Sequence, residues 1–162
     1  MDAFVEWLRA TPVSQTIVYK IWIWPLCETL HFVGLAMVIG IAGFFDLRLV
    51  GFFRQIAVDD VRELMPLAVT GFLINLVTGS IFFVGHPEQY VHNPAWWWKV
   101  AFLGLAGFNA LVFQVLVGKS TVGLRSGTDT PSAAKAIGAV SLISWFAVLY
   151  FGRMLPFLGG AF

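Results

Sequence analysis

Four apolar segments, each about as long as a bilayer is thick, constrain this chain more than any other feature. They cover residues 17–45, 64–84, 96–118 and 133–155. A helix needs about 20 apolar residues to cross about 30 Å of hydrocarbon, whereas strands of a membrane barrel are shorter and alternate in polarity. We therefore predict an all-α fold. In it, residues 1–162 form a single membrane domain, a polytopic bundle of four transmembrane helices.

The composition fits a protein that lies in lipid. Hydrophobic residues make up 59% of the chain and charged residues only 12%, about half of the share in soluble domains. The net charge of +1 predicts no nucleic-acid partner. Cys27 is the only cysteine, which excludes an intramolecular disulfide and a cysteine-based zinc site. The expected partners are the lipid bilayer and other membrane subunits or a second copy of the chain.

The N-terminal residues and the connections are less regular. The chain begins with an acidic residue, Asp2, so a cleavable signal peptide is not predicted. Residues 4–8 place apolar side chains on one side of a short helix lying in the membrane interface, which ends before Pro12; a frayed terminus is the alternative. Pro25 either kinks the first long helix or marks its start. The Gly-, Ser- and Thr-rich residues 119–132 are typical of a flexible loop.

The second helix has its own start signals, and small residues suggest where helices touch. Asp59 and Asp60 are expected to cap the second helix, with Pro66 in its first turn. Small residues four apart favour close contact between helices. Two such pairs are Ala36 with Gly40 and Ala106 with Ala110.

The distribution of cations predicts the orientation in the membrane. Six of the ten Lys and Arg residues lie in or beside the first and third connections. Cytoplasmic loops carry an excess of such residues. Both termini and the connection 85–95 are therefore expected on the outer side. The six residues are Arg48, Arg54, Arg62, Lys119, Arg125 and Lys135.

Several polar residues inside the predicted helices gather in their outer half. Glu28 and His31 lie one turn apart, with His31 roughly 15 Å below the outer end of its helix. Ionisable residues inside a membrane are costly and indicate a functional site. We predict one polar cavity there, with His31 near its floor. Its other expected residues are Asn75, Thr78, Lys99 and Arg153, with Asn109 as a further polar member.

The first interpretation of this cavity is a redox cofactor such as haem b. A neutral imidazole commonly ligates haem iron in membrane helices. His31 is the candidate iron ligand, and His86, His92 or Lys99 is the candidate second ligand. Glu28 is expected to orient His31, and the cations Lys99 and Arg153 are expected to pair with propionates.

Two other interpretations remain open. Glu28 and His31 both have side chains that can relay protons, which favours a small proton- or ion-conducting protein. Alternatively, the polar residues lock helices together in a non-catalytic structural or assembly subunit. The sequence contains no Gly-rich phosphate loop, HExxH or GxSxG motif that would indicate a particular enzyme.

Four sets of residues carry a resemblance that covers about residues 28–153. The chain resembles an uncharacterised bacterial family of small four-helix membrane proteins, which implies a bacterial inner membrane but no stated activity. The matching features are Glu28 and His31 before a DLRL exit; Pro66 with Thr78–Gly79; Tyr90, Asn93–Pro94 and Lys99 before residues 105–110; and Ser141, Trp145 and Gly152–Arg153.

A looser similarity concerns only two of these residues. The chain is similar to HemJ-type membrane protoporphyrinogen oxidases and to CopD-like copper-resistance membrane proteins. This similarity implies haem b, with His31 and Lys99 as the functional histidine and lysine. The chain departs from the HemJ pattern after the histidine, where it reads FVGLAMVIGIAGFFDLRL in place of a WxxGLxYxPRL run.

Overall fold

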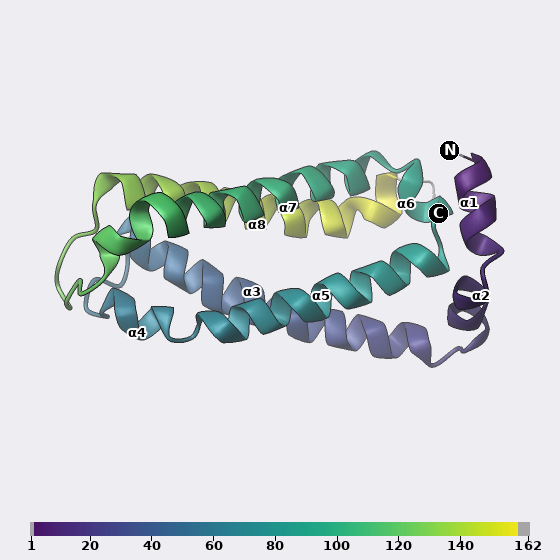
Figure 1. The fold of residues 1–162 in the computed structure, drawn as a ribbon, viewed down its shortest axis with the longest axis horizontal. Helices are drawn as coiled ribbons and strands as arrows, with labels where there is room; N and C mark the ends of the chain where they lie inside the picture. The colour runs from purple at the N-terminus through teal and green to yellow at the C-terminus, as the bar shows by residue number, and fades with distance from the viewer. Residues whose placement is uncertain (1, 159–162) are drawn as a thin grey trace.

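The computed structural model describes residues 2–158, and within this range the chain forms helices and no strand. Four helices are long and apolar enough to cross a membrane. They run antiparallel to their neighbours along the chain (Figure 1), which confirms the predicted all-α four-helix bundle. The long helices are α3 (Ile23–Val50), α5 (Met65–Gly85), α7 (Pro94–Val112) and α8 (Ser132–Leu158).

Short helices lie at both ends of the bundle. We call the end of the bundle at which α3 starts the His31 end. It carries α1 (Asp2–Arg9), α2 (Pro12–Tyr19) and α6 (Glu88–Val91). The opposite end, the Arg48 end, carries α4 (Val58–Arg62). There α7 continues as a π-helical turn over Phe113–Val117 and a 3₁₀ turn over Gly118–Thr121.

The first long helix differs from its prediction at both ends. It begins at Ile23 instead of residue 17, because Lys20 adopts an extended backbone and residues 12–19 form the separate helix α2. Pro25 marks the first turn of α3, where a missing N–H costs nothing. The helix continues past residue 45 to Val50, where Gly51, with φ of 118°, ends it in the left-handed conformation.

The start of the second long helix is only partly as predicted. Pro66 does lie in the first turn of α5. Asp59 and Asp60 do not cap it, because they lie inside the separate helix α4. The residue at the cap position is Leu64, which provides no side-chain hydrogen bond.

The bundle consists of two helix pairs, α3 with α5 and α7 with α8, joined by contacts between α3 and α8. The closest approach in the first pair is at Gly34 and Gly71, where a Cβ added to either glycine would lie 2.7 Å from the carbonyl oxygen of the other. Gly138 of α8 approaches the carbonyl oxygen of Asp46 in the same way, at 2.9 Å. The predicted contact at Gly40 is wrong, because nothing lies within 4 Å of its Cβ position.

The helices α3 and α5 cross each other, so that α3 lies closer to α7 and α8 at the Arg48 end and α5 lies closer to them at the His31 end (Figure 1). The contacts between α3 and α8 at Gly138 lie near the Arg48 end, where Phe45 and Leu49 join an apolar core with Val58 and Val61 of α4. This core joins the two pairs at the Arg48 end, and the stacked rings of Phe83 in α5 and Trp96 in α7, with centroids 5.1 Å apart, join them at the His31 end. The residues that the sequence assigns to a site lie mostly toward the His31 end.

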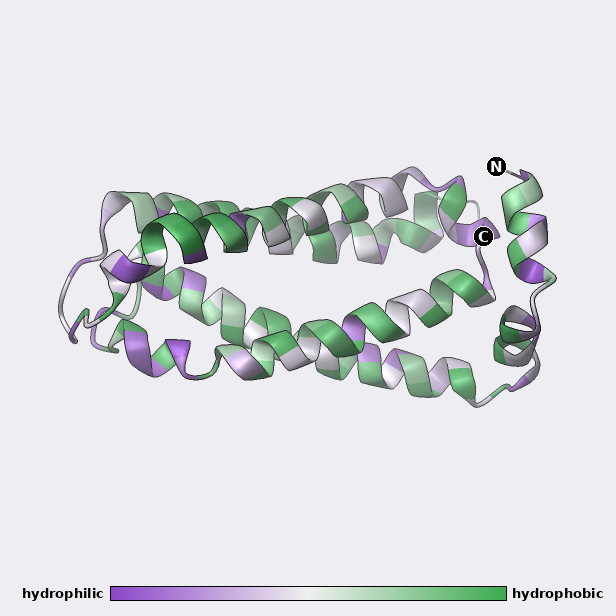
Figure 2. Ribbon diagram, viewed as in Figure 1, coloured by the Kyte–Doolittle hydropathy of each residue, from purple (hydrophilic) through white to green (hydrophobic). Residues whose placement is uncertain are grey.

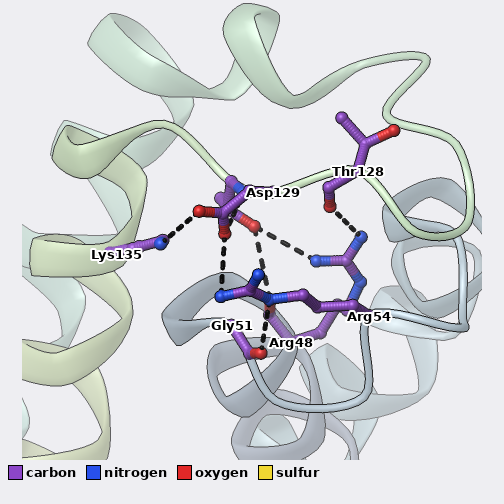
Figure 3. A network of polar contacts seen from close by, with 7 residues as sticks. Arg48, Gly51, Arg54, Thr128, Asp129 and Lys135 are labelled. Atoms are coloured by element: carbon purple, nitrogen blue, oxygen red, sulfur yellow. Dashed lines mark hydrogen bonds and ion pairs between the residues drawn. The ribbon is translucent and has the colours of Figure 1, made fainter.

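The Arg48 end is closed by a polar network that includes the loop predicted to be flexible (Figure 3). Arg48 is fully buried, and its guanidinium donates hydrogen bonds to Ile56 O at 2.6 Å, Thr130 Oγ1 at 3.1 Å and Thr128 O at 3.2 Å. Asp129 accepts a hydrogen bond from Lys135 Nζ at 2.8 Å. The hydrogen bond from Lys135 and one from the backbone of Thr130 lower the pKa of Asp129. Residues 122–131 are therefore anchored to α3 and α8.

The N-terminal helices lie across the His31 end, roughly perpendicular to the long helices (Figure 1). Val5 and Leu8 of α1 are buried, while Phe4 and Trp7 are exposed. Polar residues concentrate in these helices and in the connections, whereas the long helices are mostly apolar (Figure 2). The predicted interfacial N-terminal segment is thus helical, and it continues into a second short helix beyond Pro12.

Candidate functional site

His31 is held by a hydrogen bond from α3 to α5. Its Nδ1 lies 2.7 Å from Thr78 Oγ1, and the Thr78 hydroxyl in turn donates to Ile74 O at 2.8 Å. With the hydroxyl proton on Ile74 O, we assign Nδ1 as the donor and Thr78 Oγ1 as the acceptor. A neutral His31 in this arrangement carries its free lone pair on Nε2, the form of imidazole that ligates a metal or accepts a proton.

Asn75 fixes the backbone of α3 beside His31. In the amide orientation that satisfies both of its polar atoms, Asn75 donates to His31 O at 2.7 Å and accepts from Leu35 N at 3.0 Å. The amide fits because Gly34 has no side chain; a Cβ at Gly34 would lie 2.6 Å from an Asn75 amide atom. The structure thus brings Asn75 and Thr78 to His31 from one face of α5.

A row of aromatic rings leads from His31 to His86. Ring centroids lie 5.5 Å apart between His31 and Phe82, 4.8 Å between Phe82 and Trp24, and 5.1 Å between Trp24 and His86. His86 Nδ1 also lies 3.4 Å from Glu88 Oε1. His86 therefore lies beyond Phe82 and Trp24 and does not share a ligand position with His31.

Glu28 does not hold His31. Within residues 2–158, no hydrogen bond or ion pair joins them, and Thr78 takes the role that was predicted for Glu28. Glu28 instead lies in electrostatic range of Tyr90 in α6. Burial raises the pKa of Tyr90 to about 12, helped by the negative charges of Glu28 and Glu88, so the phenol stays protonated at neutral pH.

Lys99 approaches from the other helix pair. Its Nζ would lie 3.5 Å from a Cβ at Gly152 of α8, and its charge acts on His31. In the described part of the chain the ammonium has no hydrogen-bond or ion-pair partner. The neighbouring Arg153 is exposed and its guanidinium lies 5.3 Å from the ring centroid of Phe157. Lys99 is thus the one predicted second-ligand candidate whose charge acts on His31.

The remaining predicted residues lie elsewhere. His92 is exposed, with Nε2 3.1 Å from Asp2 Oδ1, so it ties α1 to the connection before α7. Asn109 donates to Ile137 O at 3.0 Å between α7 and α8. It is about 20 Å along α7 from its start, in the half of the bundle away from His31.

The sequence-based prediction missed Asp46, an acidic residue in that same half. It is 6% exposed and bonds Ser141 of α8, while its Oδ2 has no partner among the described residues. It was missed because the first helix was expected to end at residue 45, which put Asp46 in a loop. The helical repeat could have revealed it. Asp46 follows Glu28 by eighteen residues, which is five full turns, so the two residues lie on the same face of the helix.

The donors that the chain offers would fit a group that needs only one or two ligand atoms from the protein. Among residues 2–158, no three His, Cys, Asp or Glu side chains are arranged to hold a metal ion by themselves. A haem-type group needs only an imidazole such as His31 and at most one more donor, for which the Lys99 amine qualifies. Two hollows of about 230 and 570 Å³ are lined by other residues: the first adjoins α1 and α2, and the second lies along α8.

Comparison of the chain with protein-family models, with curated proteins and with solved structures gives no match.

Proposed function

We propose that this multi-pass membrane protein binds haem b, or a related redox group, through His31 in the half of the bundle that carries α1 and α2. The observation that carries the proposal is the hydrogen bond from His31 Nδ1 to Thr78 Oγ1. With the proton on Nδ1, Nε2 keeps its lone pair for a metal, and Thr78 holds the ring in place, which is the usual arrangement of a metal-binding histidine.

Two further features support the proposal. Lys99, on the other helix pair, acts on His31 through its charge, and its ammonium has no partner in residues 2–158. The resemblance to haem-binding four-helix membrane proteins assigns roles to the same two residues. A bound haem would supply one-electron redox chemistry. The chain's own contribution is to hold the imidazole, to place cationic Lys99 and Arg153 on that side, and to surround His31 with apolar rings.

The proposal includes a bacterial inner membrane, with both termini on the periplasmic side. Its support is the positive residues of the Arg48 end, which favour the cytoplasm for that end. The helix α1 and the C-terminal end of α8 both lie at the other end of the bundle (Figure 1).

The absorbance spectrum of the protein tests the proposal. Protein purified in detergent after expression with ample haem should show a Soret band that shifts on reduction. His31→Ala should abolish it. Thr78→Val, which removes the acceptor for Nδ1 but keeps the shape, should weaken haem binding about 10- to 100-fold.

His92→Ala is the matched control, because His92 lies at the same end but bonds Asp2. It should leave the Soret band unchanged. A protein without pigment under these conditions, or a band of equal intensity in the His31→Ala variant, would refute the proposal.

Asp46 favours a second candidate function, proton transfer between the two sides of the membrane. It gives the half near Arg48 a buried carboxyl with one oxygen free of partners among residues 2–158, on the same face of α3 as Glu28. Proteoliposomes should then show a proton flux that Asp46→Asn and Glu28→Gln each reduce about tenfold or more. Asp60→Asn, at an exposed position of α4, should not. A wild-type flux equal to that of empty vesicles would exclude this candidate.

A further inference from the structure

A hollow of about 230 Å³ lies between the N-terminal helices and the end of α5. Its polar groups come from Arg9, Ser14, Gln15 and His86, and its apolar ones from Val18 and Tyr19. Gly85 forms the wall on the α5 side, where a Cβ would lie 2.9 Å from Ile17 Cγ2. The helix α2 therefore rests directly on a glycine of α5 beside the hollow.

Ser14 is a buried polar residue without a partner for its hydroxyl. The residue is 2% exposed and lines the hollow. Its backbone N–H bonds Thr11 Oγ1 at 3.3 Å, but no described residue makes a hydrogen bond with its Oγ. Because Ser14 lines the hollow, a ligand there with an acceptor oxygen can receive a hydrogen bond from this hydroxyl.

Arg9 offers the hollow a positive charge that is only loosely paired. Its side chain is 62% exposed, and its one ion pair is a long one, from Nε to Glu88 Oε2 at 3.9 Å. The two terminal guanidinium nitrogens have no partner in the described residues. Such a guanidinium edge suits two oxygens of one phosphate group. Gln15 adds an amide whose bond to Ala10 O, at 3.4 Å, is long.

The surroundings of the hollow place it at the depth of lipid headgroups. Four aromatic side chains of α1, α2 and the residues just after them are exposed: Phe4, Trp7, Tyr19 and Trp22. Aromatic residues of this kind lie at the membrane–water interface. At this depth the abundant phosphate is that of phospholipids, whose acyl chains can follow the apolar residues beside the polar ones.

We propose that this hollow binds the phosphate group of a bilayer phospholipid, with the Arg9 guanidinium and the Ser14 hydroxyl as hydrogen-bond donors. The bound lipid would hold α1 and α2 against the end of α5. This site is separate from His31, so its fate does not depend on the redox proposal.

Native mass spectrometry of the full chain in detergent tests the proposal. The protein is stripped of lipid and titrated with dioleoyl phosphatidylglycerol. We expect one tightly held lipid per chain, weakened about tenfold by Arg9→Gln, the loss of one charged hydrogen bond. Ser14→Ala should weaken it about threefold or more. Lys20→Gln, which removes a cation of the same end that does not line the hollow, should leave the affinity unchanged.

Two further ligands identify what is bound. Dioleoylglycerol, which has the same chains and no phosphate, should not occupy the site. If it binds as tightly as the phospholipid, or if inorganic phosphate at millimolar concentration displaces the phospholipid, the proposal is wrong. If Arg9→Gln unfolds the N-terminal helices, Ser14→Ala is the deciding variant, because it leaves the ion pair of Arg9 and Glu88 in place. A Ser14→Ala protein that binds the phospholipid as tightly as the unaltered protein would overturn the proposal.

Discussion

Arg48→Met should lower the stability of the protein by about 3 kcal/mol or more, because three acceptors lose their hydrogen bonds from a buried guanidinium. The acceptors are Ile56 O, Thr128 O and Thr130 Oγ1, and Arg48 is itself fully buried. We expect the apparent melting temperature in detergent to fall by about 10 °C. Arg48→Lys should rescue little, since one ammonium cannot reproduce the planar fork of the guanidinium.

Arg125→Met is the matched control for this experiment. Arg125 lies in the same loop region, is exposed, and its side chain makes no contact with a polar partner within residues 2–158. Its replacement should change the melting temperature by less than about 2 °C. Equal shifts for the two variants would show that the network of Figure 3 does not stabilise the Arg48 end.

Gly71→Ala should separate α3 from α5 and destabilise the bundle by about 2–3 kcal/mol. The added methyl would lie 2.7 Å from both Gly34 O and Met37 Cβ. A backbone oxygen cannot turn aside as a side chain can, so the helices themselves must move. Because Asn75 and Thr78 are carried by α5, the same change should loosen the hold on His31. Melting in detergent measures the first effect, and the Soret band of a haem-loaded sample measures the second.

Gly104→Ala is the corresponding control. Nothing lies within 4 Å of a Cβ at Gly104 in α7, and alanine favours a helix by up to about 1 kcal/mol over glycine. This variant should therefore be neutral or slightly stabilised. The contrast in sign between the two glycines is the test: a Gly71→Ala protein as stable as the Gly104→Ala protein would contradict the close packing of α3 on α5.

Part of the candidate site followed from helical repeat alone. Glu28 and His31 were predicted one turn apart, and Asn75 and Thr78 on one face of the next helix. Spacing along a single helix predicts which residues share a face, but not which residue of another helix each will meet. That is why the partner of His31 was expected to be Glu28, whereas the structure gives Thr78.

The sequence by itself determined the number of long helices and the solvent in which they lie. Backbone polar groups in lipid must form their hydrogen bonds within each helix, so the length of an apolar segment is enough to predict a membrane-spanning helix. It did not determine how the helices meet. The contacts at Gly34 and Gly71, the buried position of Asp46, the anchoring of residues 122–131 by Arg48 and the hollow beside Ser14 each require residues from distant segments. Those positions were decided only by the tertiary structure. Apolar faces in lipid have no hydrophobic preference for one neighbour over another, so close packing and hydrogen bonds between helices select the pairs.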